Sequence, residues 1–360
     1  MRQPELDLAY DIKVEHGSLA KAGEFVREAA PAHRYAIITD SHVGPLYGSV
    51  AGESLGVDPR DILVIPAGET NKTRGSWGWL TDQLIERGFG RDSAIVALGG
   101  GVIGDLAGFV AATYMRGVPI VQIPTTLLAM IDASIGGKTG VDTQAGKNLV
   151  GAFHQPLGVL IDPQLLATLP LKELRTGFAE ALKHGAIANR SYFDSVVAAI
   201  PRVLYGNGEA GDSLTDLIVG SIEIKGRIVA RDEHEGGVRK ILNFGHTIGH
   251  AIEMLSDYKL AHGEAVAIGM TLESRVAELA GVARKGVAEE IKAALSSAGL
   301  PVERPRDMEP DRILEVMRAD KKKLAGSVRY ALLRDIGEMA ASNSGWTVSV
   351  SDAIVREVLT

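Results

Sequence analysis

Short apolar runs rich in β-branched residues alternate with longer amphipathic segments over the first 170 residues. Four runs are long enough to form buried strands, at residues 35–39, 61–65, 93–98 and 118–123. Because a segment of helical length separates each run from the next, this pattern predicts a parallel sheet with crossover helices. We therefore expect an α/β domain over residues 1–170.

The pattern changes after Pro170, where apolar residues recur at the spacing of three and four that is typical of α-helices. Strand-like runs return only at residues 328–333 and 346–350. We therefore expect a mainly α-helical domain over residues 171–360, with the domain boundary near residues 160–172. Its clearest helical segments are residues 172–188, 213–232, 244–255 and 262–281.

The composition limits the chemistry and the partners. The 360 residues include no cysteine, so any bound metal must be held by nitrogen and oxygen atoms. The formal net charge of −7 disfavours a nucleic-acid partner, because affinity for duplexes depends mainly on basic side chains. The longest apolar stretch, residues 94–114, is interrupted by glycines and by Asp105, which makes it unsuitable for spanning a membrane. The N-terminus has no signal-peptide pattern, and we expect a cytoplasmic protein.

A glycine-rich turn follows the third predicted strand. Gly99, Gly101 and Gly104 have the G-x-G-x-x-G spacing that brings backbone N–H groups at a helix N-terminus near a pyrophosphate. The acidic residue expected about 20 positions later for the ribose is missing, because the next strand offers only Gln122. The turn either binds a dinucleotide whose ribose is held from elsewhere or serves helix packing. Candidates for holding the ribose follow the first two predicted strands and are Asp40, Glu69 and Lys72. From the sequence alone, we favour the interpretation of these two segments as solvated loops.

A second segment, residues 123–148, combines lysines with glycines and hydroxyl side chains. Lys138 and Lys147 each follow a glycine, which lets the backbone approach an anion while the lysine supplies a positive charge. The segment is not a P-loop, because Asp132 occupies the position of the leading glycine. It is either an anion-binding loop or an exposed flexible one.

Three histidines lie within 17 positions of the second half of the chain. His246 and His250 are four residues apart, so both can point from one face of a helix, and His262 follows in a His-Gly-Glu sequence. One possible ligand set is His246 with His250, although the glutamate of the zincin motif is missing. The other set is His246, His262 and Glu180, which leaves His250 for proton transfer or anion binding. Two histidines and one carboxylate form a catalytic geometry compatible with zinc or ferrous iron.

These motifs resemble those of the 3-dehydroquinate synthase family, and they occur in the family's order across nearly the whole chain. The resemblance implies a Rossmann-like N-terminal domain that binds NAD, a mainly α-helical C-terminal domain, and a zinc ion between them, with cobalt as an alternative. It assigns the metal to Glu180, His246 and His262. The segments that carry the resemblance are residues 99–105, 122–127, 136–138, 146–148, 242–246 and 262–266.

The resemblance also implies which residues contact the ligands. For NAD these are Asp40, His42, Glu69, Thr70, Asn71, Lys72, Gly101, Val102, Ile103, Gly104, Asp105, Thr125, Thr126, Asp132, Lys138, Lys147, Leu165, Leu166, Ala167 and Thr168. For the substrate they are Arg116, Lys138, Asn148, Lys183, Lys225, Arg239, Asn243, His250 and one lysine of residues 321–323, of which we favour Lys322. His250 and Glu235 are candidates for proton handling, although Glu235 could instead be a structural partner of Lys225 or Arg239.

The implied reaction converts 3-deoxy-D-arabino-heptulosonate 7-phosphate into 3-dehydroquinate and phosphate, a step of the shikimate pathway to the aromatic amino acids. It combines transient oxidation by NAD, β-elimination of phosphate, reduction and an intramolecular aldol closure, and a homodimer is the expected assembly. Two alternatives stay open: another sugar phosphate cyclase, or an NAD- and metal-dependent polyol dehydrogenase. The dehydrogenase would release NADH and would have little use for so many cationic residues.

Overall fold

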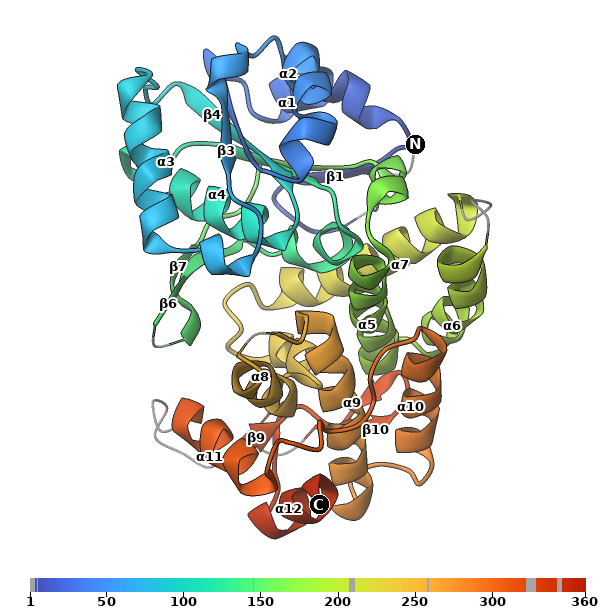
Figure 1. Cartoon of the computed structure of the whole chain (residues 1–360). Coiled ribbons are helices and arrows are strands. Elements are labelled where there is room, and N and C mark those ends of the chain that lie inside the picture. The colour runs from blue at the N-terminus through green and yellow to red at the C-terminus, as the bar shows by residue number, and fades with distance from the viewer. Residues whose placement is uncertain are drawn as a thin grey trace. The chain divides into compact units, whose positions relative to one another are not determined.

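The computed structural model describes residues 4, 6–144, 146–206, 211–257, 259–321, 328–341 and 345–360. The chain divides into two compact units, Met1–Pro170 and Leu171–Thr360. Each unit has its own cluster of buried apolar side chains. Figure 1 shows the elements of both units, coloured along the chain.

The N-terminal unit is built on a six-stranded sheet in the order β1-β8-β5-β4-β2-β3. Every pairing between neighbouring strands is parallel, which confirms the predicted α/β fold class. β4 is buried at every position, as expected for a continuous apolar run inside a parallel sheet. The strands are β1 (Asp11–Val14), β2 (Arg34–Asp40), β3 (Ile62–Ile65), β4 (Ser93–Gly99), β5 (Ile120–Pro124) and β8 (Gly158–Ile161).

The order of the strands reverses between β2 and β4. β3 pairs with one edge of β2, and the chain then crosses to place β4 along the other edge. Ligands of open α/β sheets bind beyond the carboxyl ends of the strands at such a reversal. Here the carboxyl ends of β5, β4, β2 and β3 are consecutive in the sheet, so the segments that follow these four strands form one edge.

Helices cover this sheet, and a separate hairpin packs on one of them. The hairpin consists of the antiparallel strands β6 (Lys138–Thr143) and β7 (Gly146–Phe153), and β6 packs on α4. Lys138 and Lys147 therefore lie on strands of a hairpin and not in a loop. Its glycines conceal the strand pattern: Gly140 and Gly151 are paired, and a Cβ atom on Gly151 would lie 2.1 Å from the Thr139 carbonyl oxygen. The helices are α1 (Ala22–Ala29), α2 (Ser49–Leu55), α3 (Arg74–Glu86) and α4 (Gly101–Thr113).

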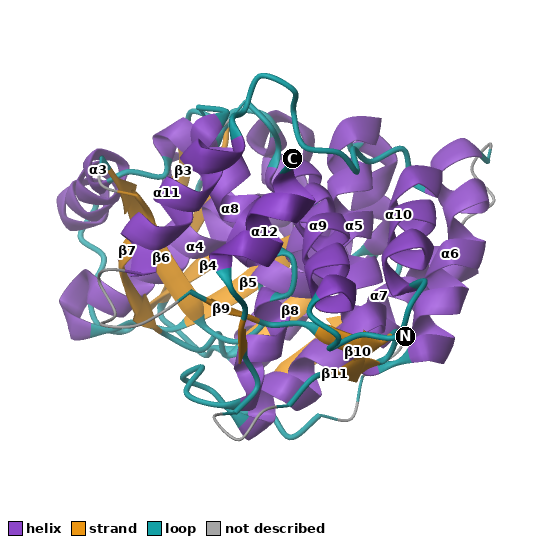
Figure 2. Cartoon of the chain, turned by 90° about the horizontal axis from the view of Figure 1, so that it is seen from below, coloured by secondary structure: helices purple, strands orange, loops and turns teal. Residues whose placement is uncertain are grey.

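The C-terminal unit is mainly α-helical, as predicted (Figure 2). It also carries two small antiparallel strand pairs, β9 with β12 and β10 with β11. None of the described helices is long and apolar enough to cross a membrane. The helices are α5 (Leu171–Ala188), α6 (Arg190–Tyr205), α7 (Gly211–Arg231), α8 (His246–Leu255), α9 (His262–Leu279), α10 (Val287–Ser297), α11 (Pro310–Lys321) and α12 (Asp352–Leu359). The short strands are β9 (Arg329–Tyr330), β10 (Leu333–Asp335), β11 (Glu338–Met339) and β12 (Val348–Ser349).

Glycines allow the backbones of α8 and α9 to approach each other closely. A Cβ atom on Gly269 of α9 would lie 1.9 Å from the carbonyl oxygen of Gly245, and one on Gly249 would lie 2.9 Å from the carbonyl oxygen of Ala265. Gly245 also has a φ of +80°, a conformation that favours glycine. The distance between these two helices therefore depends on the absence of side chains at the contact.

We expect Gly269→Ala to destabilise the protein by about 1–3 kcal/mol, because the new methyl group must push α8 and α9 apart. Gly78→Ala in α3 is the matched control, since a Cβ atom at that helical position meets nothing within 4 Å. Urea unfolding followed by circular dichroism measures both effects. Equal loss of stability in the two variants would show that the close contact between α8 and α9 does not account for the effect of Gly269→Ala.

Candidate active site

The carboxylate of Glu180 is completely buried in the middle of α5. It forms an ion pair with Lys183, which lies one turn later and is also buried. Neither carboxylate oxygen of Glu180 has a hydrogen-bond partner among the described residues. Because burying a carboxylate without hydrogen bonds is strongly unfavourable, this geometry indicates that the carboxylate binds a further positively charged group.

Two imidazole nitrogens face the same oxygen of Glu180. The Nε2 atoms of His246 and His262 each lie 3.8 Å from Glu180 Oε1. Ligand atoms bound to one tetrahedral zinc ion are about 3.4 Å apart, given bonds of about 2.1 Å. Both separations of 3.8 Å are close to this spacing, so the two imidazoles and the carboxylate fit a metal.

His250 lies in the same cluster, so the alternative ligand set is also close in space. Its ring centroid lies 5.0 Å from that of His246 and 5.7 Å from that of His262. One ring nitrogen of each of the three histidines lies within 4.8 Å of the others. The set with Glu180 contains a buried carboxylate that lies 3.8 Å from both of its imidazoles, whereas His250 is exposed to solvent.

The other nitrogens of the two candidate ligands have acceptors. His246 Nδ1 lies 3.2 Å from the carbonyl oxygen of Phe244, and His262 Nδ1 lies 3.4 Å from the carboxylate of Glu253. Such partners fix the ring orientation of metal-binding histidines and increase the basicity of the other nitrogen. Here they leave both Nε2 atoms directed towards Glu180.

The surroundings move the pKa values of the two histidines in opposite directions. Burial, together with the positive charges of Lys183 and the other histidines, lowers the pKa of His246 well below its ordinary value. His246 is therefore neutral near pH 7, as metal binding requires. Burial alone would also lower the pKa of His262, but the hydrogen bond and the charge of Glu253 outweigh burial and raise it.

A second buried carboxylate determines where α8 begins. Glu273 of α9 accepts hydrogen bonds from the backbone nitrogens of Gly245 and Ile248, at 2.8 and 2.9 Å. The N-cap residue Gly245 has no side chain to cap the helix, so Glu273 satisfies the free N–H groups in its place. This arrangement fixes His246 at the first position of α8.

The segment between α7 and α8 is held by Asp232. Its carboxylate accepts hydrogen bonds from the backbone nitrogens of Gly236, Gly237 and Arg239. Partial desolvation alone would raise the pKa of Asp232, but these hydrogen bonds outweigh desolvation and lower the pKa. The 3₁₀ helix Val238–Asn243, which carries two predicted substrate residues, therefore starts from a fixed position.

Within this segment the predicted residues contact one another. Arg239 is buried and donates a hydrogen bond to the carbonyl oxygen of Glu233. The side-chain amide of Asn243 donates to the carboxylate of Glu235, which has a φ of +58°. Backbone strain of this kind is common at functional sites. Lys225, in α7, is buried in the same unit.

The remaining predicted substrate residues lie elsewhere. Arg116, Lys138 and Asn148 are exposed residues of the N-terminal unit. Arg116 and Asn148 have positive φ values of 68° and 52°. Lys322 lies outside the described residues.

In the N-terminal unit, Lys72 is the centre of a buried charge cluster beyond β3 and β4. Its ammonium lies 2.5 Å from the carboxylate of Asp105 and 3.9 Å from that of Glu69, which in turn lies 3.4 Å from Lys147. Burial alone would lower the pKa of Lys72, but the Asp105 and Glu69 carboxylates outweigh burial and raise it. The sequence prediction of solvated loops is therefore wrong for Lys72, which is only 3% exposed.

The glycine turn is compatible with both interpretations of its sequence. α4 begins at Gly101 without a side-chain cap, so its first N–H groups can approach an anion. The glycines are also needed for packing, because a Cβ atom on Gly104 would lie 3.0 Å from the side chain of Gln122. Gln122 donates a hydrogen bond to the Gly104 carbonyl oxygen, which accounts for the amide at the position where an acid was expected.

The other predicted NAD residues lie in the turns after the strands. Asp40 accepts hydrogen bonds from the backbone nitrogens of His42 and Val43. The hydroxyl of Thr125 is buried and has no hydrogen-bond partner among the described residues. Thr126 accepts from the backbone nitrogen of Ala129. The rest lie in short helical turns or the first turn of α4: Thr70 and Asn71 (Glu69–Asn71), Val102 and Ile103 (α4), Asp132 (Ala129–Ala133), and Leu165, Leu166, Ala167 and Thr168 (Pro163–Thr168).

Three carboxylates that position the site, Glu253, Glu273 and Asp232, were missed by the sequence analysis. Glu253 has a recognisable signal, because it follows His246 by seven residues and therefore shares its face of α8. Glu273 and Asp232 act through backbone N–H groups of other segments. Their spacing in the sequence gives no sign of this role.

Comparison with known proteins gives a consistent result over the whole chain. Models of the 3-dehydroquinate synthase N-terminal and C-terminal domains match residues 62–176 and 177–323. A 3-dehydroquinate synthase from a Synechococcus species is 44% identical over 360 residues, covering 98% of this chain and 95% of its own. A structure of 2-epi-5-epi-valiolone synthase from Streptomyces hygroscopicus, with NAD⁺ and Zn²⁺ bound, has a TM-score of 0.87 and 30% identity, covering 98% of this chain and 96% of its own. A structure of 2-deoxy-scyllo-inosose synthase, with carbaglucose-6-phosphate, NAD⁺ and Co²⁺, has a TM-score of 0.86 and 27% identity, covering 99% of this chain and 98% of its own.

We expect Glu253→Gln to weaken zinc binding about 10–100-fold, because the amide is a poorer acceptor for the His262 imidazole. Competition with a chromophoric chelator measures the affinity. Glu289→Gln, an exposed position on α10, is the control for the loss of one negative charge. Equal zinc affinity in both variants would exclude a positioning role for Glu253.

Proposed function

The chain belongs to the 3-dehydroquinate synthase family, and on this premise we propose that it converts 3-deoxy-D-arabino-heptulosonate 7-phosphate into 3-dehydroquinate and phosphate. The observation that carries the proposal is the buried carboxylate of Glu180, with one oxygen 3.8 Å from two imidazole nitrogens. In the same unit, Lys183, Lys225 and Arg239 are buried cations suited to an anionic substrate.

We propose that Glu180, His246 and His262 hold a zinc ion, or a cobalt ion in its place. Related structures contain these two metals together with NAD⁺, which supports the assignment. When bound, the metal supplies a Lewis acid for the substrate oxygens and NAD supplies a reversible acceptor of hydride. The chain contributes a neutral His246 and the fixed orientation of both rings.

The cationic residues of the C-terminal unit are proposed to bind the carboxylate end of the substrate. Arg239 provides a planar fork that suits a carboxylate, and Lys225 adds a compact charge. Asn243, already hydrogen-bonded to Glu235, adds an uncharged donor. Holding both ends of the substrate orients it for the later ring closure. The residues proposed for the phosphate and for other substrate contacts are Lys183, Arg116, Lys138, Asn148 and Lys322.

His250 is proposed to move protons during the reaction. It is exposed, and its ring centroid lies 5.0 Å from that of His246. Imidazole is the side chain most often used as a general acid or base in proteins. Glu235 is proposed to assist, since its carboxylate contacts Asn243.

The N-terminal unit is proposed to bind NAD along the carboxyl edge of its sheet. The uncapped start of α4 offers N–H groups to the pyrophosphate, and Asp40 and Glu69 offer carboxylates for hydroxyl groups. The pair of Lys72 and Asp105 holds the turns after β3 and β4 together. A homodimer and a cytoplasmic location, both expected from the sequence, stay predictions.

With NAD and zinc, we expect the purified protein to release inorganic phosphate from the heptulosonate phosphate without accumulating NADH. The reason is that each turnover returns the hydride to the substrate. A colorimetric phosphate assay and the absorbance of NADH, followed in one reaction, measure both quantities. Steady accumulation of NADH would favour the polyol dehydrogenase alternative.

We expect His262→Ala to lose bound zinc and His250→Ala to retain it while turnover falls about 100-fold or more, because His250 is proposed to act as an acid and base. Metal analysis of the purified variants and the phosphate assay separate the two roles. Loss of zinc from both variants would restore the ligand set that combines His246 with His250.

A further inference from the structure

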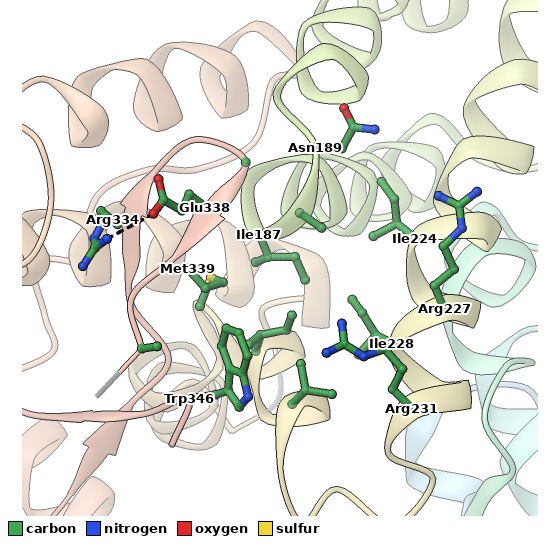
Figure 3. A pocket seen from close by; sticks show the side chains of 15 residues that line it. Ile187, Asn189, Ile224, Arg227, Ile228, Arg231, Arg334, Glu338, Met339 and Trp346 are labelled. Carbon is green, nitrogen blue, oxygen red and sulfur yellow. Dashed lines mark hydrogen bonds and ion pairs between the residues drawn. The ribbon is translucent and has the colours of Figure 1, made fainter. Parts of the chain in front are cut away.

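A cavity of about 500 Å³ lies in the C-terminal unit, and the proposed reaction does not use it. Its walls come from the end of α5, the C-terminal part of α7, the 3₁₀ helix Val238–Asn243 and the strands β10 and β11 (Figure 3). This volume is within the range of about 300–1,000 Å³ that is typical of sites for small organic ligands. None of the residues that line it is among the proposed metal, substrate or NAD residues.

The wall of the cavity combines an apolar surface with an excess of positive charge. Ile187, Ile228 and Trp346 surround its centre in Figure 3. The charged residues that line it are three arginines, Arg227, Arg231 and Arg334, and one glutamate, Glu338. A ligand with an apolar body and a single negative charge would therefore match the wall.

Arg231 is the arginine best placed to bind the charge. Arg334 is paired with Glu338 at 3.3 Å, and Arg227 is paired with Glu223 at 3.2 Å. Arg231 forms no ion pair within the described part of the chain, and Figure 3 shows its guanidinium directed towards the apolar residues of the cavity. A guanidinium can bind a carboxylate through two parallel hydrogen bonds.

The cavity also touches the segment that carries the proposed substrate residues. Val238 and Ile241 line it, and they alternate along the 3₁₀ helix with Arg239 and Asn243. Ile224, which also lines it, immediately precedes Lys225 on α7. A ligand that contacts these apolar side chains would therefore affect the position of the backbone that carries Lys225, Arg239 and Asn243.

We propose that this cavity is an effector site for a carboxylate with a compact apolar ring, bound by Arg231 and packed against Trp346. Binding there is coupled to substrate affinity through the 3₁₀ helix Val238–Asn243. The binding half of the proposal is independent of the proposed function, whereas the coupling half rests on it.

The test uses 3-phenylpropionate as the probe and tryptophan emission as the first readout, without substrate. The chain has three tryptophans, and the other two, Trp77 and Trp79, belong to the N-terminal unit. We expect a saturable change in emission that Trp346→Phe removes. We also expect Arg231→Ala to weaken the binding of the probe about tenfold or more, because it loses a charge-assisted hydrogen-bonded pair.

Two controls separate specific binding from general effects of charge and hydrophobicity. Arg275→Ala removes an exposed arginine of α9 outside the cavity and should bind the probe as the unchanged protein does. The neutral amide, 3-phenylpropionamide, should bind more weakly than the acid. Absence of saturable binding, or equal affinity of the Arg231→Ala and Arg275→Ala variants for the probe, would overturn the site.

The second readout is the KM for the heptulosonate phosphate in the phosphate assay, with and without saturating probe. We expect a change of about fivefold or more, the usual lower range of coupling between sites. The change should disappear in Arg231→Ala at the same probe concentration. Saturable binding with an unchanged KM would overturn the coupling, whereas absence of phosphate release without the probe would contradict the proposed function alone.

Discussion

The contact between α8 and α9 determines where the histidine cluster lies. His246 and His250 belong to one helix and His262 begins the other, so the spacing of the two backbones sets the spacing of the rings. Gly245, Gly249 and Gly269 permit this spacing, because side chains there would overlap the facing backbone. Glu273 then adds a polar link across the same contact, from α9 to the first turn of α8. The chemistry of the site therefore depends on a packing constraint made largely of residues without side chains.

Buried charge is the second constraint, and it is organised differently in the two units. In the N-terminal unit, Lys72 is stabilised by carboxylates on either side, so the cluster is satisfied by the protein itself. In the C-terminal unit, Glu180 has Lys183 as an ion-pair partner but no hydrogen bond among the described residues. A fully satisfied cluster is typical of a structural role, whereas an unsatisfied carboxylate facing two imidazoles is typical of a ligand site.

The sequence predicts features that depend on local periodicity. Long amphipathic helices such as α5 and α9, and buried strands such as β4, are evident because their apolar positions recur regularly. The hairpin β6–β7 was mistaken for a loop because the glycines required for close strand approach resemble those of a turn. Glu273 could not be foreseen, since its partners are N–H groups 25 and 28 residues away. The spacing of the histidines in the sequence points to a site, whereas the choice of Glu180, His246 and His262 as the metal ligands depends on the family resemblance.

All three proposed metal ligands belong to the C-terminal unit, one each on α5, α8 and α9. A metal held by them therefore acts as a cross-link among three helices whose positions along the sequence differ by up to 82 residues, from Glu180 to His262. By thermodynamic linkage, an ion present at 100 times its dissociation constant adds about 2.7 kcal/mol to the stability of the state that binds it. All three helices belong to the C-terminal unit, so a chelator that removes the ion would remove this contribution to the stability of that unit.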